Sequence, residues 1–173
     1  LIFARMHIPL YQSGTEDILQ KSVIATVLMA LDAALSGFDQ KSVLRYLRSA
    51  LSPVDPDTCD RIENYAIIWG IRGQKWTQSW ENHPDGLSGV WTEDDRDRME
   101  ELNAARELAI APLTRLWQGF RDASDLRGQI LALYGFLEDI SLEMRLSRMA
   151  QELDAAGDNR AAQILNQLWE ILL

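Results

Sequence analysis

Apolar side chains recur at intervals of three and four residues through most of this chain, the spacing of one face of an α-helix. Between these stretches stand residues that start or end helices. The starting residues are Asp39, Asp55-Pro56, Thr92, Ser124 and Asp158, and the ending residues are Gly37, Gly70 and Gly157. The pattern predicts an all-α fold of about six to seven helices, over residues 16–35, 39–51, 55–70, 92–120, 124–137, 142–155 and 158 onward.

Three stretches depart from this pattern. Residues 1–12 are predicted to form a short extended segment, limited in length by Pro9. Residues 71–91 lack a helical period and hold Trp76, Trp80 and Trp91, which predicts a long tryptophan-rich loop that is packed onto something. Pro112 lies within the fourth apolar pattern and is expected to kink or break that helix.

The length of 173 residues suits one helical domain over 1–173, with no internal linker. The chain starts at Leu1 and stops on three aliphatic residues, so we expect a piece of a longer protein. A single cysteine favours a reducing compartment, and no apolar run is long enough for a membrane helix. We therefore expect a cytoplasmic protein with no membrane association.

The sequence lacks the common catalytic patterns. It has no phosphate-binding Gly-x-x-x-x-Gly-Lys-Ser/Thr loop, and its two histidines stand apart. His83 precedes a proline and is expected to be solvated, whereas Cys59 lies on an apolar helical face and is expected to be buried. The acids near residues 93–101 suit the first turns of a helix rather than a metal site. The sequence predicts no catalytic residue, metal or cofactor within this chain.

Charge is unevenly distributed. The net charge of −9 argues against a generic nucleic-acid coat. However, residues 1–91 carry a net −2 and residues 92–173 a net −7. Two stretches of the first half hold cations and no acid. The cations are Lys41, Arg45 and Arg48, on one helical stripe, and Arg72 and Lys75, beside Trp76 and Trp80. Cations interleaved with aromatics suit nucleic acid, and a solvated helix face with a tryptophan-pinned loop is the other interpretation.

Four motifs occur in order between residues 8 and 80: Ile8-Pro9-Leu10-Tyr11, Val43-Leu44-Arg45-Tyr46-Leu47-Arg48-Ser49-Ala50-Leu51, Asp60-Arg61-Ile62-Glu63-Asn64-Tyr65 and Trp69-Gly70-Ile71-Arg72-Gly73-Gln74-Lys75-Trp76. This stretch resembles the AddB/RexB family, one of the two subunits of the bacterial ATP-dependent helicase–nuclease. Arg48 stands for the usual lysine and Ala50 for the usual glycine, and a proline often found near residues 21–22 is absent.

The resemblance implies a helical insertion like the 2B subdomain of UvrD-type helicases, within a protein that processes DNA double-strand breaks. Its parent complex would use ATP, magnesium and an iron–sulfur cluster, and its partner would be the other helicase–nuclease subunit of the same heterodimer. Gly70-Ile71-Arg72-Gly73 resembles a glycine-containing turn that touches duplex DNA.

Two functions follow, besides an unrelated helical enzyme whose pocket the sequence does not reveal. One is a non-catalytic domain that guides DNA with the five cations on one face and Trp76 or Trp80 exposed beside them. The other is an interaction domain that docks on the partner helicase subunit without touching DNA.

Overall fold

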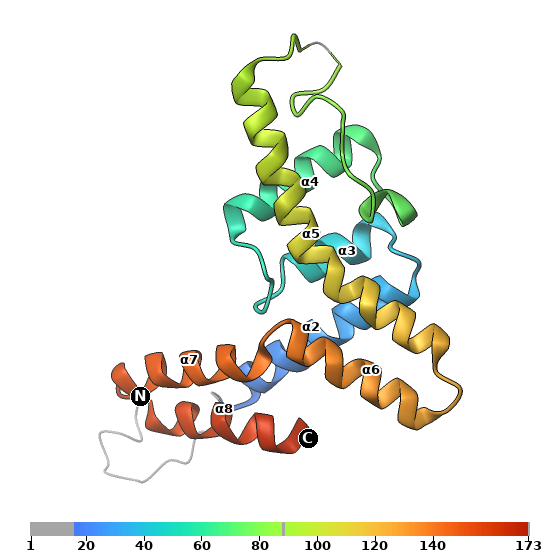
Figure 1. Ribbon diagram of the computed structural model, residues 1–173. Coiled ribbons are helices and arrows are strands. Elements are labelled where there is room, and N and C mark those ends of the chain that lie inside the picture. Colours follow the sequence, from blue (N-terminus) through green and yellow to red (C-terminus); the bar gives the residue numbers. More distant parts are fainter. Residues whose placement is uncertain (1–15, 88, 173) are drawn as a thin grey trace, which may run out of the picture. The chain divides into compact units, whose positions relative to one another are not determined.

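The computed structural model describes the backbone of residues 16–87 and 89–172, and side chains within residues 22–87 and 89–167 (Figure 1). The described part is all-helical, as predicted, with seven α-helices, one 3-10 turn and no strand. The elements are α2 (Glu16–Leu35), α3 (Gln40–Leu47), α4 (Pro56–Trp69), η1 (Gly73–Trp76), α5 (Glu93–Asp122), α6 (Leu126–Asp139), α7 (Leu142–Ala155) and α8 (Asn159–Leu172). The extended segment expected at residues 1–12 lies outside the described residues. No described helix has both the length and the apolar character to cross a membrane.

Side-chain caps start these helices where the sequence predicts them, with one exception. The Asp39 carboxylate accepts from the backbone at the start of α3, and Asp55 does the same for α4. Thr92 caps α5 in a reciprocal capping box with the third residue of the helix. The prediction that Ser124 caps the next helix is wrong. Asp125 caps α6 instead, because its carboxylate reaches the backbone N–H three residues further on, at 2.8 Å.

The described chain divides into two compact units. The central unit is residues 25–142, and the terminal unit is residues 16–24 with 143–172. In the terminal unit, α7 and α8 are joined by a short turn at Gly157 and bury small and aliphatic side chains. These are Leu146, Ala150, Ala161, Ala162 and Leu165. That residues 1–173 act as one domain stays a prediction.

The core of the central unit forms around the long helix α5. This helix packs against α4 and α6, and α3 packs against α4. The stripes predicted for α3, α4 and α5 are buried as expected, including Val43, Leu47, Leu51, Cys59, Ile62, Met99, Leu113 and Leu116. The tight packing of these helices provides a firm base for the loop between α4 and α5.

Two predicted apolar faces and one predicted break are wrong. In α2 the buried side is formed by Val23 and small residues, whereas Leu28 and Leu35 are exposed. In α6 the predicted Ile130 is exposed. α5 runs through Pro112 without a break, because buried residues on both sides of the proline stabilise the helix by more than the one lost backbone hydrogen bond costs.

Candidate functional site

The two tryptophans of residues 71–80 lie inside the central unit. Trp76 is 0% exposed and Trp80 is 5% exposed. The Trp80 ring stacks on Tyr65 of α4, with centroids 4.6 Å apart and planes at 10°, and Trp76 packs beside Trp80 at 5.7 Å. The prediction that the tryptophans pin this loop is confirmed. The prediction that Trp76 or Trp80 is exposed beside the cations is wrong, because the loop uses both indoles to complete the core.

Two polar residues of α5 hold the loop backbone against the helix. The Asn103 side chain accepts from the N–H of Trp80 at 2.8 Å and donates to its carbonyl at 2.9 Å. The buried guanidinium of Arg106 donates to the carbonyl of Trp76 at 3.0 Å and lies 5.9 Å from the Trp80 ring centroid. The sequence analysis missed both residues. The signal that could have found Arg106 is a cation within the apolar stripe of α5, since such a residue needs buried acceptors.

The start of α3, the end of α4 and η1 meet at a set of backbone contacts. The N–H of Gly73 donates to the carbonyl of Phe38 at 2.8 Å, which joins η1 to the turn between α2 and α3. The Gln40 side chain donates to the carbonyl of Ala66 at 2.6 Å, which joins the first residue of α3 to the last turn of α4. Gly73 has a φ of +58°, a conformation that glycine adopts easily. These contacts fix where the neighbouring side chains lie.

Three of the five predicted cations surround this junction. Lys41 follows Gln40 in α3, and Arg72 and Lys75 flank Gly73. All three are exposed, and within the described residues none forms an ion pair with a carboxylate. The Lys75 ammonium donates to the carbonyl of Trp69 at 3.5 Å, which orients it without cancelling its charge. We call Lys41, Arg72 and Lys75 the basic edge.

The other two predicted cations are paired with acids from neighbouring helices. Arg45 lies 3.5 Å from the carboxylate of Asp32 on α2. Arg48 donates to Asp60, at 2.9 Å, and to Glu63, both on α4. The hydrogen bond with Glu63 is the main reason that the pKa of Arg48 is raised above its usual value. Although residues 40–54 hold no acid, folding therefore supplies three, and this part of the predicted cationic stripe is largely neutralised.

The loop between η1 and α5 ends in a buried histidine. The Nδ1 atom of His83 accepts from the N–H of Asp85 at 3.1 Å, so the proton of a neutral ring lies on Nε2, which faces a carboxylate oxygen of Asp95 at 3.5 Å. Trp91 packs against the ring at 4.9 Å, and Trp69 donates to the His83 carbonyl at 3.1 Å. The prediction that His83 is solvated is wrong, because the loop folds back onto the start of α5 and covers the ring.

Asp95 links this loop to the start of α5. Its carboxylate accepts from the N–H and the hydroxyl of Thr92, at 2.9 and 2.6 Å, and from the guanidinium of Arg98 at 2.7 Å. The Thr92 hydroxyl is the largest cause that lowers the pKa of Asp95 to about 2. Asp95 is therefore ionised at neutral pH. At least this one of the predicted first-turn acids serves the start of the helix.

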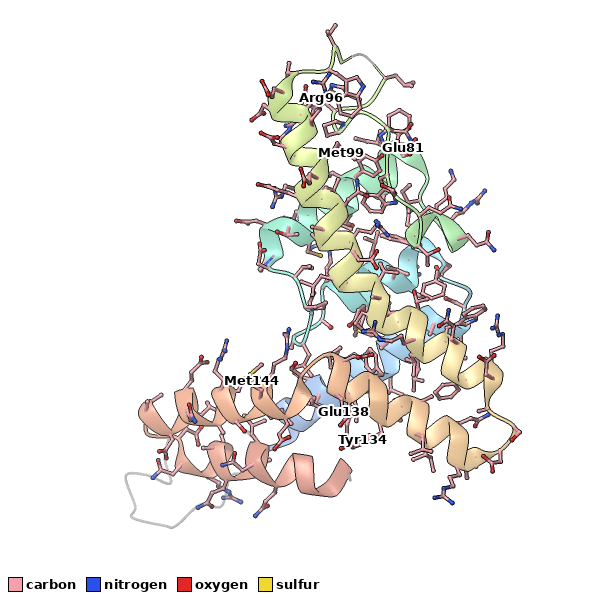
Figure 2. All side chains as sticks on the ribbon, viewed as in Figure 1. Glu81, Arg96, Met99, Tyr134, Glu138 and Met144 are labelled. Atoms are coloured by element: carbon pink, nitrogen blue, oxygen red, sulfur yellow. The ribbon has the colours of Figure 1, made fainter. Side chains whose placement is uncertain are left out.

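The described residues contain no group of three or more side chains able to hold a metal ion. Cys59 is buried, as predicted, and burial raises the pKa of its thiol. What the central unit offers is therefore surface: a basic edge near the middle of α5 and an acidic loop at its start. Figure 2 shows Arg96 in the first turns of α5, near that loop.

No protein-family model matches the chain. Over 99% of its length it is 31% identical to the AddB protein of the ATP-dependent helicase/deoxyribonuclease from Geobacillus thermodenitrificans, and equally to that from Geobacillus kaustophilus. It is 24% identical over its whole length to the protein of the same name from Clostridium acetobutylicum. The chain is homologous to a segment of this protein. It spans about 15–16% of the length of these relatives, and the similarity extends past residue 80 to the later helices.

Proposed function

We propose that the chain is a non-catalytic accessory domain of an ATP-dependent helicase–nuclease subunit, and that it contacts DNA through the basic edge. The observation that carries this proposal is the gathering of Lys41, Arg72 and Lys75 around the Phe38–Gly73 junction with no described carboxylate paired to them. Cations that keep their charge are the groups that bind phosphates and release counterions.

The structure narrows the earlier hypothesis in two ways. Arg45 and Arg48 face carboxylates, so we leave them outside the contact surface. Trp76 and Trp80 are buried, so neither can stack on a base. The resulting contact is with the phosphate backbone and carries no base sequence. The alternative, a domain that docks on the partner subunit without touching DNA, is favoured by no observation at this edge.

The proposal places the chain within a larger machine. The names of its relatives describe an ATP-dependent helicase and deoxyribonuclease. We infer that the parent acts in the processing and recombinational repair of DNA breaks in the cytoplasm, together with the other helicase–nuclease subunit of a heterodimer. ATP, magnesium and an iron–sulfur cluster would be held elsewhere in that complex, and we assign this chain no step of their chemistry.

The test is fluorescence anisotropy with a forked DNA duplex, repeated over a series of salt concentrations. A variant with Lys41→Ala, Arg72→Ala and Lys75→Ala is compared with the unchanged chain. Three lost phosphate contacts should flatten the slope of log K against log salt by about 3. The matched control removes three other exposed cations of the central unit, with Arg115→Ala, Arg121→Ala and Arg127→Ala.

The control has the same change in net charge but lies on α5 and α6, away from the junction. It should lower the affinity for the forked duplex only slightly. Equal loss in the two variants would show that binding follows net charge rather than the basic edge. No binding by the unchanged chain below about 100 μM at low salt would contradict a DNA contact.

A further inference from the structure

The loop before α5 carries the most exposed large apolar side chains of the described residues. Leu87 is 94% exposed and Val90 is 88% exposed, and Trp91 is also exposed. Ile68 of α4 continues this surface, since it lies 3.7 Å from the place where a Cβ of Gly86 would stand. We call Ile68, Leu87, Val90 and Trp91 the apolar tip. Scattered exposed aliphatics are ordinary, but a group of four from two elements is typical of an interaction site.

The residues around the apolar tip are firmly anchored, so its exposure is not a consequence of a loose loop. On one side, the Asp85 carboxylate accepts from the guanidinium of Arg98 at 2.7 Å, and Gly86 is buried. On the other side, Gly89 lies so close to the His83 ring that a Cβ there would overlap it. The fold thus holds apolar side chains in water at a fixed place.

The surroundings of the apolar tip are strongly acidic. Residues 85–97 hold five acids and a single cation, Arg96. The side chains of Asp85 and Asp94 are 65% and 85% exposed, and Arg98 is shared among Asp85, Asp94 and Asp95. Such a rim repels phosphates, which argues against DNA and against an anionic lipid surface. It attracts a partner that presents cations around an apolar stripe.

We propose that the apolar tip docks a basic amphipathic helix of a partner protein, with aliphatic side chains on the tip and lysine or arginine against the acidic rim. Charge complementarity selects this occupant, and apolar burial supplies the affinity. This surface differs from the basic edge in position and in sign, so the inference does not depend on the proposed DNA contact.

The test uses the full 173-residue chain and a model amphipathic helix of leucine and lysine, followed by ¹H–¹⁵N NMR titration. The chain should bind this peptide with shift changes at residues 86–97, and should bind the leucine and glutamate counterpart at least tenfold more weakly. Leu87→Ser with Val90→Ser should weaken binding about tenfold or more, since two exposed aliphatics lose their apolar contact. Asp94→Asn with Asp97→Asn should weaken it a few-fold and reduce its salt dependence.

The matched control is Ile130→Ser with Leu131→Ser, two exposed aliphatics of α6. It should bind the peptide like the unchanged chain. All variants should keep their melting temperature, because the substituted side chains are exposed. The inference is overturned by equal binding of the two peptides, by equal loss in the tip and control variants, or by no binding at all. It is also overturned if the tip variant loses affinity for forked DNA, whereas failure of the peptide test leaves the salt slope of the basic edge unaffected.

Discussion

The basic edge and the apolar tip come from the same irregular stretch between α4 and α5, yet they are built in different ways. The basic edge is placed by backbone hydrogen bonds, such as that from Gly73 to Phe38, so its side chains remain available. The apolar tip is placed by side-chain pairs, with His83, Asp85 and Asp95 committed to holding the loop. A surface keeps its charges for a partner when the backbone does the positioning.

The two surfaces lie at different points along α5. Trp76, next to the basic edge, is held by Arg106, whereas the loop under the tip is held at Asp95. Eleven residues of helix separate these anchors, which corresponds to about 16 Å. This distance exceeds the Debye length at physiological salt, so the acidic rim screens little of the basic edge. The overall charge of −9 therefore describes neither surface.

The largest expected difference between the two regions is in stability. Trp76→Ala should lower the free energy of unfolding by about 3–5 kcal/mol, because it empties a fully buried site beneath the basic edge. Leu87→Ser at the tip should change it by less than about 0.5 kcal/mol, because the side chain is already in water. Urea denaturation of both variants measures the contrast, and a small effect of Trp76→Ala would contradict its place in the core.

The two glycines that position these regions should also differ. Gly89→Ala should destabilise the chain by about 1–3 kcal/mol, because the added methyl overlaps the His83 ring. Gly73→Ala should cost about 1 kcal/mol, because its positive φ strains a Cβ while the space around it is open. Thermal unfolding checks the order. A larger loss for Gly73→Ala would show that backbone strain exceeds crowding here.

The cap of α5 should contribute a smaller amount. Thr92→Ala should lower the free energy of unfolding by about 1 kcal/mol, since it removes one acceptor for the helix N-terminus and one donor to Asp95. Thr92→Ser retains the hydroxyl and serves as the control, with a loss well below that of alanine. Chemical denaturation of the pair makes the comparison, and equal losses would assign the effect to the lost methyl group instead.

Acid should affect the two regions differently. The pKa of Asp95 is about 2 in the folded chain, below the ordinary value of about 3.9, so its ionised form stabilises the fold above about pH 4. That contribution is lost as the pH falls from about 4 to about 2. Asp95→Asn should be less stable at neutral pH and should show a flatter stability profile over this range. Asp97→Asn, at an exposed acid, should keep the original slope, and identical profiles for the two variants would contradict the assignment.

The smallest expected effect concerns the paired cations. Arg45→Gln with Arg48→Gln should leave the salt slope of forked-duplex binding nearly unchanged, because carboxylates of α2 and α4 already meet both guanidinium groups. The same anisotropy series measures it. A slope flattened by about 2 would place both arginines on DNA and extend the basic edge along α3.

Much of the fold follows from the sequence because its signals are local. The period of apolar residues and the caps at Asp39, Asp55 and Thr92 predict the helices, since a cap acts within three or four residues of itself. The errors concern packing. The buried faces of α2 and α6 depend on which neighbour each helix meets, and their many apolar residues allow more than one choice.

The sequence by itself determined an all-helical chain, a tryptophan-pinned loop and the identity of five candidate cations. The tertiary structure alone decided which of these cations meet carboxylates, because Asp32, Asp60 and Glu63 arrive from other helices. It also buried His83 against Asp95, twelve residues away, and left Leu87 in water. Charge and exposure are properties of neighbours in space, and a sequence specifies those neighbours only through the packing of the whole unit.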